Sequence, residues 1–141
     1  MQDILLFIQH HLMLSAALAL ILVILIALEF IKIKRGASRL SPSQAVQMMN
    51  RQNTPVIDLR SFDTFLLGHI VGAISIPMSE LESKLKKIEK FKSQPIVLVC
   101  GTGIESSRAA TTLIKHGYHP QVLSGGMQAW RDAEMPVVKG N

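Results

Sequence analysis

Residues 95–106 read Pro-Ile-Val-Leu-Val-Cys-Gly-Thr-Gly-Ile-Glu-Ser, and they carry the strongest fold signal in the chain. Their first five residues form a continuous apolar run, which is typical of a strand buried in the centre of a parallel sheet. A loop with two glycines follows, and a helix is predicted from about Ser106. This order predicts an α/β domain with Cys100 at the carboxyl end of the strand, where open α/β sheets bind their ligands.

Helix and strand signals alternate on both sides of this stretch. Residues 41–44 have the pattern of a helix start, with Ser41 as N-cap, Pro42 at the first helical position and Gln44 closing a capping box. Further helices are predicted for residues 61–67, 106–116 and 127–133, and strands for residues 56–59, 73–77, 95–99 and 121–123. The predicted fold class is α/β, a small domain with a mainly parallel central sheet flanked by helices.

Residues 79–92 combine an apolar stripe with many charges. Leu81, Leu85, Ile88 and Phe91 recur at helical spacing, and five lysines alternate with three glutamates around them. This pattern predicts an amphipathic helix. Its charged side is expected to face solvent, with contact to anionic lipid or an acidic partner as the alternative.

The composition points to a second, apolar part of the chain. The 141 residues are 48% hydrophobic but only 5% aromatic and 18% charged, which excludes a collagen, a disordered tail and a disulfide-stapled mini-protein. Much of the aliphatic excess lies in residues 12–28, LMLSAALALILVILIAL, which carry no charge. A transmembrane helix is predicted over residues 12–33. A core helix or a cleaved signal peptide fits less well, because the run is apolar on all sides and is followed, not preceded, by basic residues.

The basic residues also predict an orientation. They are Lys32, Lys34, Arg35 and Arg39. Positive residues stay on the cytoplasmic side, so the N-terminus is expected outside and the rest in the cytoplasm, at the plasma membrane if the cell is bacterial. The single cysteine agrees with a reducing compartment. The expected organisation is a short segment 1–11, the span 12–33, a basic linker 34–40, a domain over 41–138 and a tail 139–141.

The loop after Cys100 has the composition of an anion-binding cradle. Gly101 and Gly103 let the backbone curl so that successive N–H groups point inward, and the following helix adds the positive end of its dipole. A thiolate, or a sulfur atom attached to it, would be stabilised there. The alternative is a buried, inert cysteine at a strand end, which composition alone favours about as strongly.

Three motifs, in this order, resemble the rhodanese family from about residue 40 to residue 138. They are VIDLR at 56–60 with GHIVGAISIP at 68–77, CGTGIES at 100–106, and LSGGMQAW at 123–130. The resemblance implies that Cys100 is the nucleophile, which takes sulfane sulfur from a donor, holds it as a persulfide and passes it to a thiophilic acceptor. It implies no cofactor, and a substrate-binding loop made by the backbone of Gly101, Thr102, Gly103, Ile104, Glu105 and Ser106.

Glu105 departs from the commonest pattern of this family, which has a basic residue there. A carboxylate would oppose thiosulfate, a dianion, so the expected donor is a protein persulfide or a low-molecular-weight persulfide. The start of the loop is closer to that of mercaptopyruvate sulfurtransferases. A related phosphatase family needs an arginine six positions after its nucleophile, whereas this chain has Ser106 there and Arg108 two residues too far. Phosphatase activity is therefore not expected.

The remaining motif residues are expected to be structural. Asp58 and Arg60 are expected to form an ion pair or hydrogen bond, with substrate contact as the alternative. His69 is interpreted as an architectural residue, Gly125-Gly126 as a tight turn into the last helix, and no histidine or cysteine cluster has the spacing of a metal site. The residues assigned to this structural group are Asp58, Arg60, Gly68, His69, Gly72, Gly125, Gly126 and Trp130.

The expected function is therefore membrane-anchored sulfur transfer. With one cysteine the persulfide cannot be resolved as an internal disulfide, so the sulfur must leave to cyanide, a small thiol or a protein thiol. The alternative is a catalytically weak rhodanese module that serves as a membrane-bound adaptor. The expected partners are the membrane, a sulfur donor and an acceptor. Nucleic acid is not expected, since no aromatic residues interleave with the basic ones.

Overall fold

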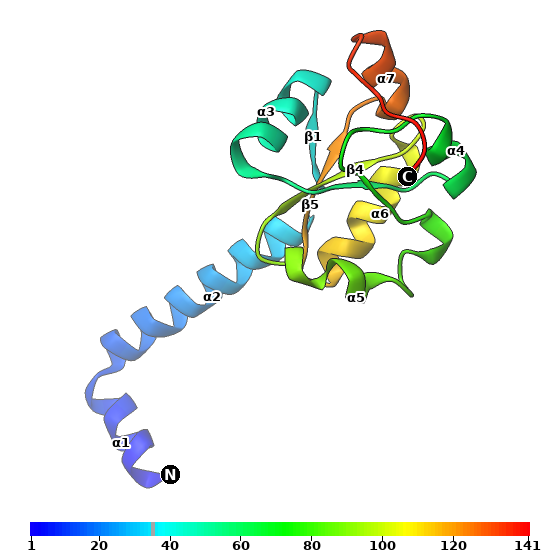
Figure 1. Cartoon of the computed structure of the whole chain (residues 1–141). Coiled ribbons are helices and arrows are strands. Elements are labelled where there is room, and N and C mark those ends of the chain that lie inside the picture. The colour runs from blue at the N-terminus through cyan, green and yellow to red at the C-terminus, as the bar shows by residue number, and fades with distance from the viewer. Residues whose placement is uncertain (35) are drawn as a thin grey trace. The chain divides into compact units, whose positions relative to one another are not determined.

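A computed structural model describes residues 1–34 and 36–141 of the chain. The chain divides into two compact units, Met1–Arg35 and Gly36–Asn141. Figure 1 shows the helices and strands of both units.

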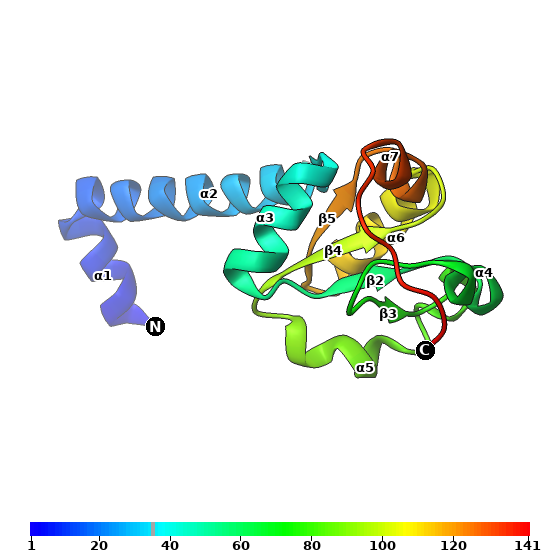
Figure 2. The ribbon, with the colours of Figure 1, turned by 45° about the horizontal axis from the view of Figure 1, so that its top comes forward.

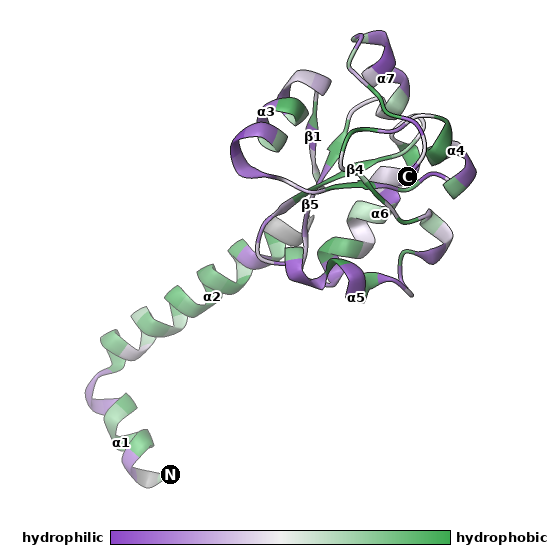
Figure 3. Cartoon of the chain, in the orientation of Figure 1, coloured by the Kyte–Doolittle hydropathy of each residue, from purple (hydrophilic) through white to green (hydrophobic). Residues whose placement is uncertain are grey.

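The first unit consists of two helices, α1 (Gln2–His10) and α2 (Leu12–Lys34). The segment Leu12–Ile31 is long and apolar enough to cross a membrane, and none of it is buried. Its large apolar residues are exposed on all sides of the helix. Figure 3 shows α2 coloured as hydrophobic along most of its length. At 1.5 Å per residue the 23 residues of α2 extend about 34 Å, close to the thickness of a bilayer's hydrocarbon core. Residues 1–11, expected only to be a short segment, are largely helical as well.

The second unit is built on a five-stranded sheet in the order β1-β5-β4-β2-β3, with every neighbouring pair parallel. The strands are β1 (Ser38–Leu40), β2 (Val56–Asp58), β3 (Ile74–Ser75), β4 (Pro95–Val99) and β5 (His119–Leu123). The central strand is β4, and its Val97 aligns with Val56 of β2 and Gln121 of β5. The predicted α/β fold with a parallel central sheet is confirmed.

Helices cover both faces of the sheet (Figure 2). They are α3 (Pro42–Gln52), α4 (Phe62–Leu67), α5 (Leu85–Ile88), α6 (Ile104–Lys115) and α7 (Gly126–Asp132), with 3-10 turns η1 (Met78–Glu80) and η2 (Glu89–Phe91). Ile96 and Leu98 of β4 pack into one core cluster with α5 and α6, whereas Val97 and Val99 pack into a second cluster with α3 and α7. The apolar run of β4 therefore feeds two cores, because successive side chains of a strand point to opposite faces.

Two parts of the domain differ from the sequence-based prediction. Residues 38–40 form the edge strand β1, although they were expected to belong to the basic linker 34–40. This strand has three residues, of which only Leu40 is buried. So short a segment shows no alternation of apolar and polar residues from which a strand could be predicted. Residues 79–92 do not form one amphipathic helix but break into η1, α5 and η2. The Ser83 hydroxyl donates to the Glu80 carbonyl at 2.9 Å within this segment.

Smaller differences concern element ends. Helix α6 begins at Ile104, two residues before the predicted start, and β5 begins at His119 instead of Gln121. Strand β3 has two residues, although five were predicted. The predicted capping box of α3 is present: the Ser41 hydroxyl accepts from the Gln44 N–H, and the Gln44 side chain accepts from the Ser41 N–H.

Candidate active site

Cys100 follows directly after β4, at the carboxyl edge of the sheet. Only 1% of the residue is exposed, yet it lines a pocket of about 570 Å³. Its Sγ accepts a hydrogen bond from the Gly103 N–H at 2.9 Å. A donor directed at the sulfur matches negative charge there, either on a thiolate or on a sulfur atom bound to it.

The loop delivers Gly103 to the start of α6 in a left-handed conformation. Gly103, which has no side chain to cap the helix, is the N-cap of α6 with φ +95°. A Cβ at this position would lie 3.3 Å from the Gly125 nitrogen, so both the conformation and the space favour glycine. The first N–H groups of α6 lack helical partners, and together with the helix dipole they make this end of the pocket favourable to anions.

The residues around Gly125-Gly126, at the start of α7, hold the backbone of the cysteine loop. The Met127 N–H donates to the Cys100 carbonyl at 2.8 Å, and the Gln128 N–H donates to the Gly101 carbonyl at 3.1 Å. Gly126 lies so close that a Cβ there would be 2.3 Å from the Cys100 oxygen. Gly125-Gly126 does form the turn into α7, but its contact with the cysteine loop was not predicted. In the sequence, the only indication of this contact is the spacing between the motif at 100–106 and the motif at 123–130.

Asp58 and Arg60 form a buried ion pair at the end of β2. The Arg60 Nη2 atom lies 2.7 Å from Asp58 Oδ2, and Nε donates to the same carboxylate. Nη2 also donates to the Gly68 carbonyl at 2.7 Å, which ties the residues after β2 to the end of α4. Arg60 lines the same pocket as Cys100. The pair is therefore a structural link whose cation borders the site.

The other structural motif residues lie away from the pocket lining. His69 is buried, stacks on the Phe65 ring with 3.7 Å between centroids, and its Nδ1 lies 2.9 Å from the Phe65 carbonyl oxygen. Trp130 is buried in the second core cluster, and its Nε1–H donates to the Pro136 carbonyl at 3.0 Å. Gly72 has φ +76° in the turn that precedes β3.

Several residues of the pocket were not assigned to the site from the sequence. Ser61 and Thr64 come from the start of α4, and Arg108 comes from the second turn of α6. Of the loop residues predicted to bind substrate, Gly101, Thr102, Ile104 and Glu105 line the pocket. Ser106 is fully buried and does not line the pocket, and its Oγ has no hydrogen-bond partner among the residues that the structure describes.

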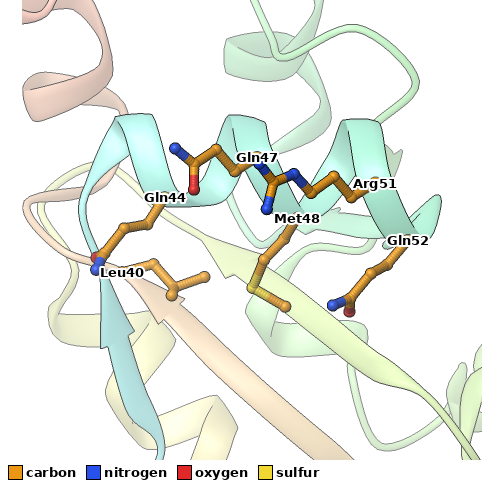
Figure 4. Close-up of a pocket in the computed structure, with 6 residues that line it drawn as sticks. All are labelled: Leu40, Gln44, Gln47, Met48, Arg51 and Gln52. Atoms are coloured by element: carbon orange, nitrogen blue, oxygen red, sulfur yellow. The ribbon is translucent and has the colours of Figure 1, made fainter.

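A second pocket lies along α3 and is chemically different (Figure 4). It has a volume of about 270 Å³, and Gln44, Gln47 and Gln52 surround it with amide groups. Leu40, Met48 and Arg51 complete its lining. Amides and a guanidinium supply hydrogen bonds but no nucleophile or acid–base pair, so this pocket lacks the reactive chemistry that a cysteine provides. Across residues 1–34 and 36–141, no three His, Cys, Asp or Glu side chains gather closely enough to hold a metal ion.

A parallel α/β domain with a cysteine at a strand end, cradled by a glycine loop and a helix start, is the architecture of the rhodanese class. Residues 41–133 match the sequence model of the Rhodanese-like domain, and the chain belongs to this family. The resemblance inferred from the three motifs is thereby confirmed.

Related proteins agree with this assignment. The chain is 31% identical over 142 residues to the "Uncharacterized protein YibN" of Escherichia coli K12, covering 99% of both chains. It is 34% identical over 95 residues to the thiosulfate sulfurtransferase GlpE of Shewanella oneidensis, covering 67% of this chain and 92% of that protein. The crystal structure of a rhodanese-related protein from Thermoplasma volcanium superposes with a TM-score of 0.67 at 26% identity, covering 73% of this chain and 99% of that one.

Proposed function

We propose that the protein is a membrane-anchored sulfurtransferase that carries sulfane sulfur as a persulfide on Cys100. The observation that carries the proposal is the Gly103 N–H directed at Sγ from 2.9 Å, on a cysteine that lines a pocket. A buried, inert cysteine requires neither a pocket beside it nor a cysteine loop that α7 holds by hydrogen bonds. The similarity to proteins named thiosulfate sulfurtransferase gives further support.

The transfer is a pair of displacements at sulfur. The Cys100 thiolate attacks the outer sulfur of the donor, so that a bond forms from Sγ to that sulfur and the donor's S–S bond breaks. The electron pair of the broken bond leaves with the rest of the donor as a thiolate or as sulfite. An acceptor thiolate or cyanide then attacks the outer sulfur of the persulfide and regenerates the Cys100 thiolate. No external oxidant or reductant is needed.

The chain spans the membrane once, with its N-terminus outside and the rhodanese domain in the cytoplasm. The length and apolarity of Leu12–Ile31 support the span, and the basic residues that follow it support the orientation. The reducing cytoplasm would keep Cys100 available for sulfur transfer. The partners are a sulfur donor and a thiol or protein acceptor that reach the domain at the membrane.

The alternative function is that of a membrane-bound adaptor with weak or no catalysis. It is favoured by Ile104, an apolar side chain that is 64% exposed while it lines the Cys100 pocket. A protein partner could bury this side chain and close the pocket. In that case Cys100 would be a contact residue of the interface.

Intact-mass spectrometry of the full-length protein in detergent tests the proposal. The protein and its Cys100→Ser variant are incubated separately with thiosulfate and with cysteine persulfide, and the mass is measured before and after addition of cyanide. A gain of one sulfur atom that cyanide removes, absent in the Ser variant, is the expected result. If no donor adds sulfur to Cys100, the proposed sulfurtransferase activity is wrong and the adaptor function is favoured.

A further inference from the structure

Two opposite charges border the Cys100 pocket on one face of α6. Glu105 lies in the first turn and Arg108 in the next, and both line the pocket. Residues three apart on a helix are neighbours, with their Cβ atoms about 5–6 Å apart. Both side chains are exposed. In the part of the chain that the structure describes, neither belongs to an ion pair.

The third charged side chain of the pocket, Arg60, already has a counter-charge. Its guanidinium pairs with Asp58 and donates to the Gly68 carbonyl. The charges left for a ligand are therefore one carboxylate and one guanidinium, which sum to zero. A dianion such as thiosulfate finds no net positive charge from these side chains, whereas a zwitterion can satisfy both of them.

We infer that Glu105 and Arg108 recognise the amino-acid part of a low-molecular-weight persulfide, Glu105 binding its ammonium group and Arg108 its carboxylate. The two groups of an α-amino acid sit on one carbon, which suits two neighbouring side chains of a helix. Arg108 can accept the carboxylate with two parallel N–H donors. The inference rests on the proposed sulfur transfer at Cys100 and names the class of donor for that same pocket.

The position of the pair also suits the reacting sulfur. Cys100 is buried where it lines the pocket, whereas Glu105 and Arg108, which line the same pocket, are exposed. In an amino-acid persulfide the outer sulfur is separated from the α-carbon by a methylene group and one sulfur atom. Binding of the head group at the border therefore lets the outer sulfur extend toward Sγ. The displacement is that given above, and the amino-acid thiolate is the leaving group.

Matched donors and variants test the inference. The rate of persulfide formation on full-length protein is measured with cysteine persulfide, its N-acetyl form, its methyl ester and thiosulfate. The variants are Glu105→Gln and Arg108→Gln, with Glu82→Gln and Lys115→Gln as controls that make the same charge changes on exposed residues outside the pocket. The controls correct for the general effect of net charge.

We expect Glu105→Gln to lower kcat/KM about two- to fivefold for cysteine persulfide and its methyl ester but not for the N-acetyl form, which lacks the ammonium charge. We expect Arg108→Gln to lower it similarly for cysteine persulfide and its N-acetyl form but not for the ester. Equal effects on all donors, or none beyond those of the controls, would overturn the inference while sulfur transfer stands. Failure of every donor to load the wild-type protein would overturn the proposed function, and the inference with it.

Discussion

The backbone carbonyl of Cys100 accepts a 2.8 Å hydrogen bond from the N–H of Met127, the second residue of α7. This bond joins the second and third rhodanese motifs, which lie far apart in the sequence. The N-terminus of α7 thus holds the backbone of the cysteine loop, while Gly103, the N-cap of α6, donates its N–H to the cysteine sulfur. The loop is fixed from two sides by helix starts whose N–H groups would otherwise lack partners.

The first prediction concerns Gly126, which makes this approach possible. A Cβ at residue 126 would lie 2.3 Å from the Cys100 oxygen, and the residue has φ +58°. We expect Gly126→Ala to destabilise the protein by more than about 1 kcal/mol and to slow persulfide formation, because both the clash and the left-handed backbone must be relieved. Trp130, the single tryptophan, reports unfolding of the domain by its fluorescence.

Gly101→Ala is the matched control for stability, because a Cβ at that position would meet nothing within 4 Å. We expect its free energy of unfolding to stay within about 0.5 kcal/mol of the wild type. If Gly126→Ala were as stable as this control, the close approach of α7 to the loop would not constrain the domain.

The second prediction concerns the buried pair of Asp58 and Arg60. Replacing Asp58 with Asn leaves the Arg60 guanidinium buried without its counter-charge, and we expect a loss of about 3–5 kcal/mol in the free energy of unfolding. Denaturant unfolding followed by Trp130 fluorescence measures it. In a double-mutant cycle with Arg60→Met, the double variant should lose less than the sum of the single losses. Additive losses would show that the two residues do not act as a pair.

The sequence predicted the parts of the fold that local pattern determines. The apolar run of β4 and the capping box of Ser41 and Gln44 depend on neighbouring residues, and both appear in the structure. Strand β1 was not predicted, because its pairing with β5 joins residues about eighty positions apart in the sequence. The helix expected over residues 79–92 shows the opposite failure, since its regular apolar stripe is present but the structure has η1, α5 and η2 in place of one helix.

The candidate site was predictable to a similar extent. Cys100 and its glycine loop could be predicted as a site because a strand, a loop and a helix follow one another in the sequence. Thr64 and Arg108 could not be assigned, because a pocket wall depends on which helices the sheet brings together. The bond from Met127 to Cys100 uses only backbone atoms, so no side-chain pattern records it.

The third prediction concerns the apolar helix α2. Leu20 and Val23 are exposed side chains near the middle of the proposed span. Changing both to Lys should cost about 2.5–3.5 kcal/mol per residue for membrane insertion, so we expect the protein to move from the membrane fraction to the soluble fraction. Changing them to Ile is the control and should leave the protein in the membrane. A wild-type protein whose intact mass lacks this segment would identify it as a cleaved signal sequence instead of an anchor.

The last prediction concerns the pH dependence that Tyr118 introduces. Burial, and to a lesser extent the negative charge of Glu89, raise the pKa of Tyr118 above its usual value of 10.0. The part-buried hydroxyl also donates to the Leu85 carbonyl at 3.2 Å, a bond that ionisation would break. The folded protein therefore retains the phenol proton at a pH where the unfolded chain has lost it.

The resulting stability is fully present below pH 10.0 and is lost as the pH rises through the folded-state pKa. Because Tyr118 is the single tyrosine, the ultraviolet absorbance of tyrosinate reports it directly. We expect a titration midpoint above 10.0, and Glu89→Gln should lower it without reaching that value, since burial is the larger cause. Tyr118→Phe should lose less stability than the wild type over this pH range. A wild-type midpoint at or below 10.0 would contradict the burial of this hydroxyl.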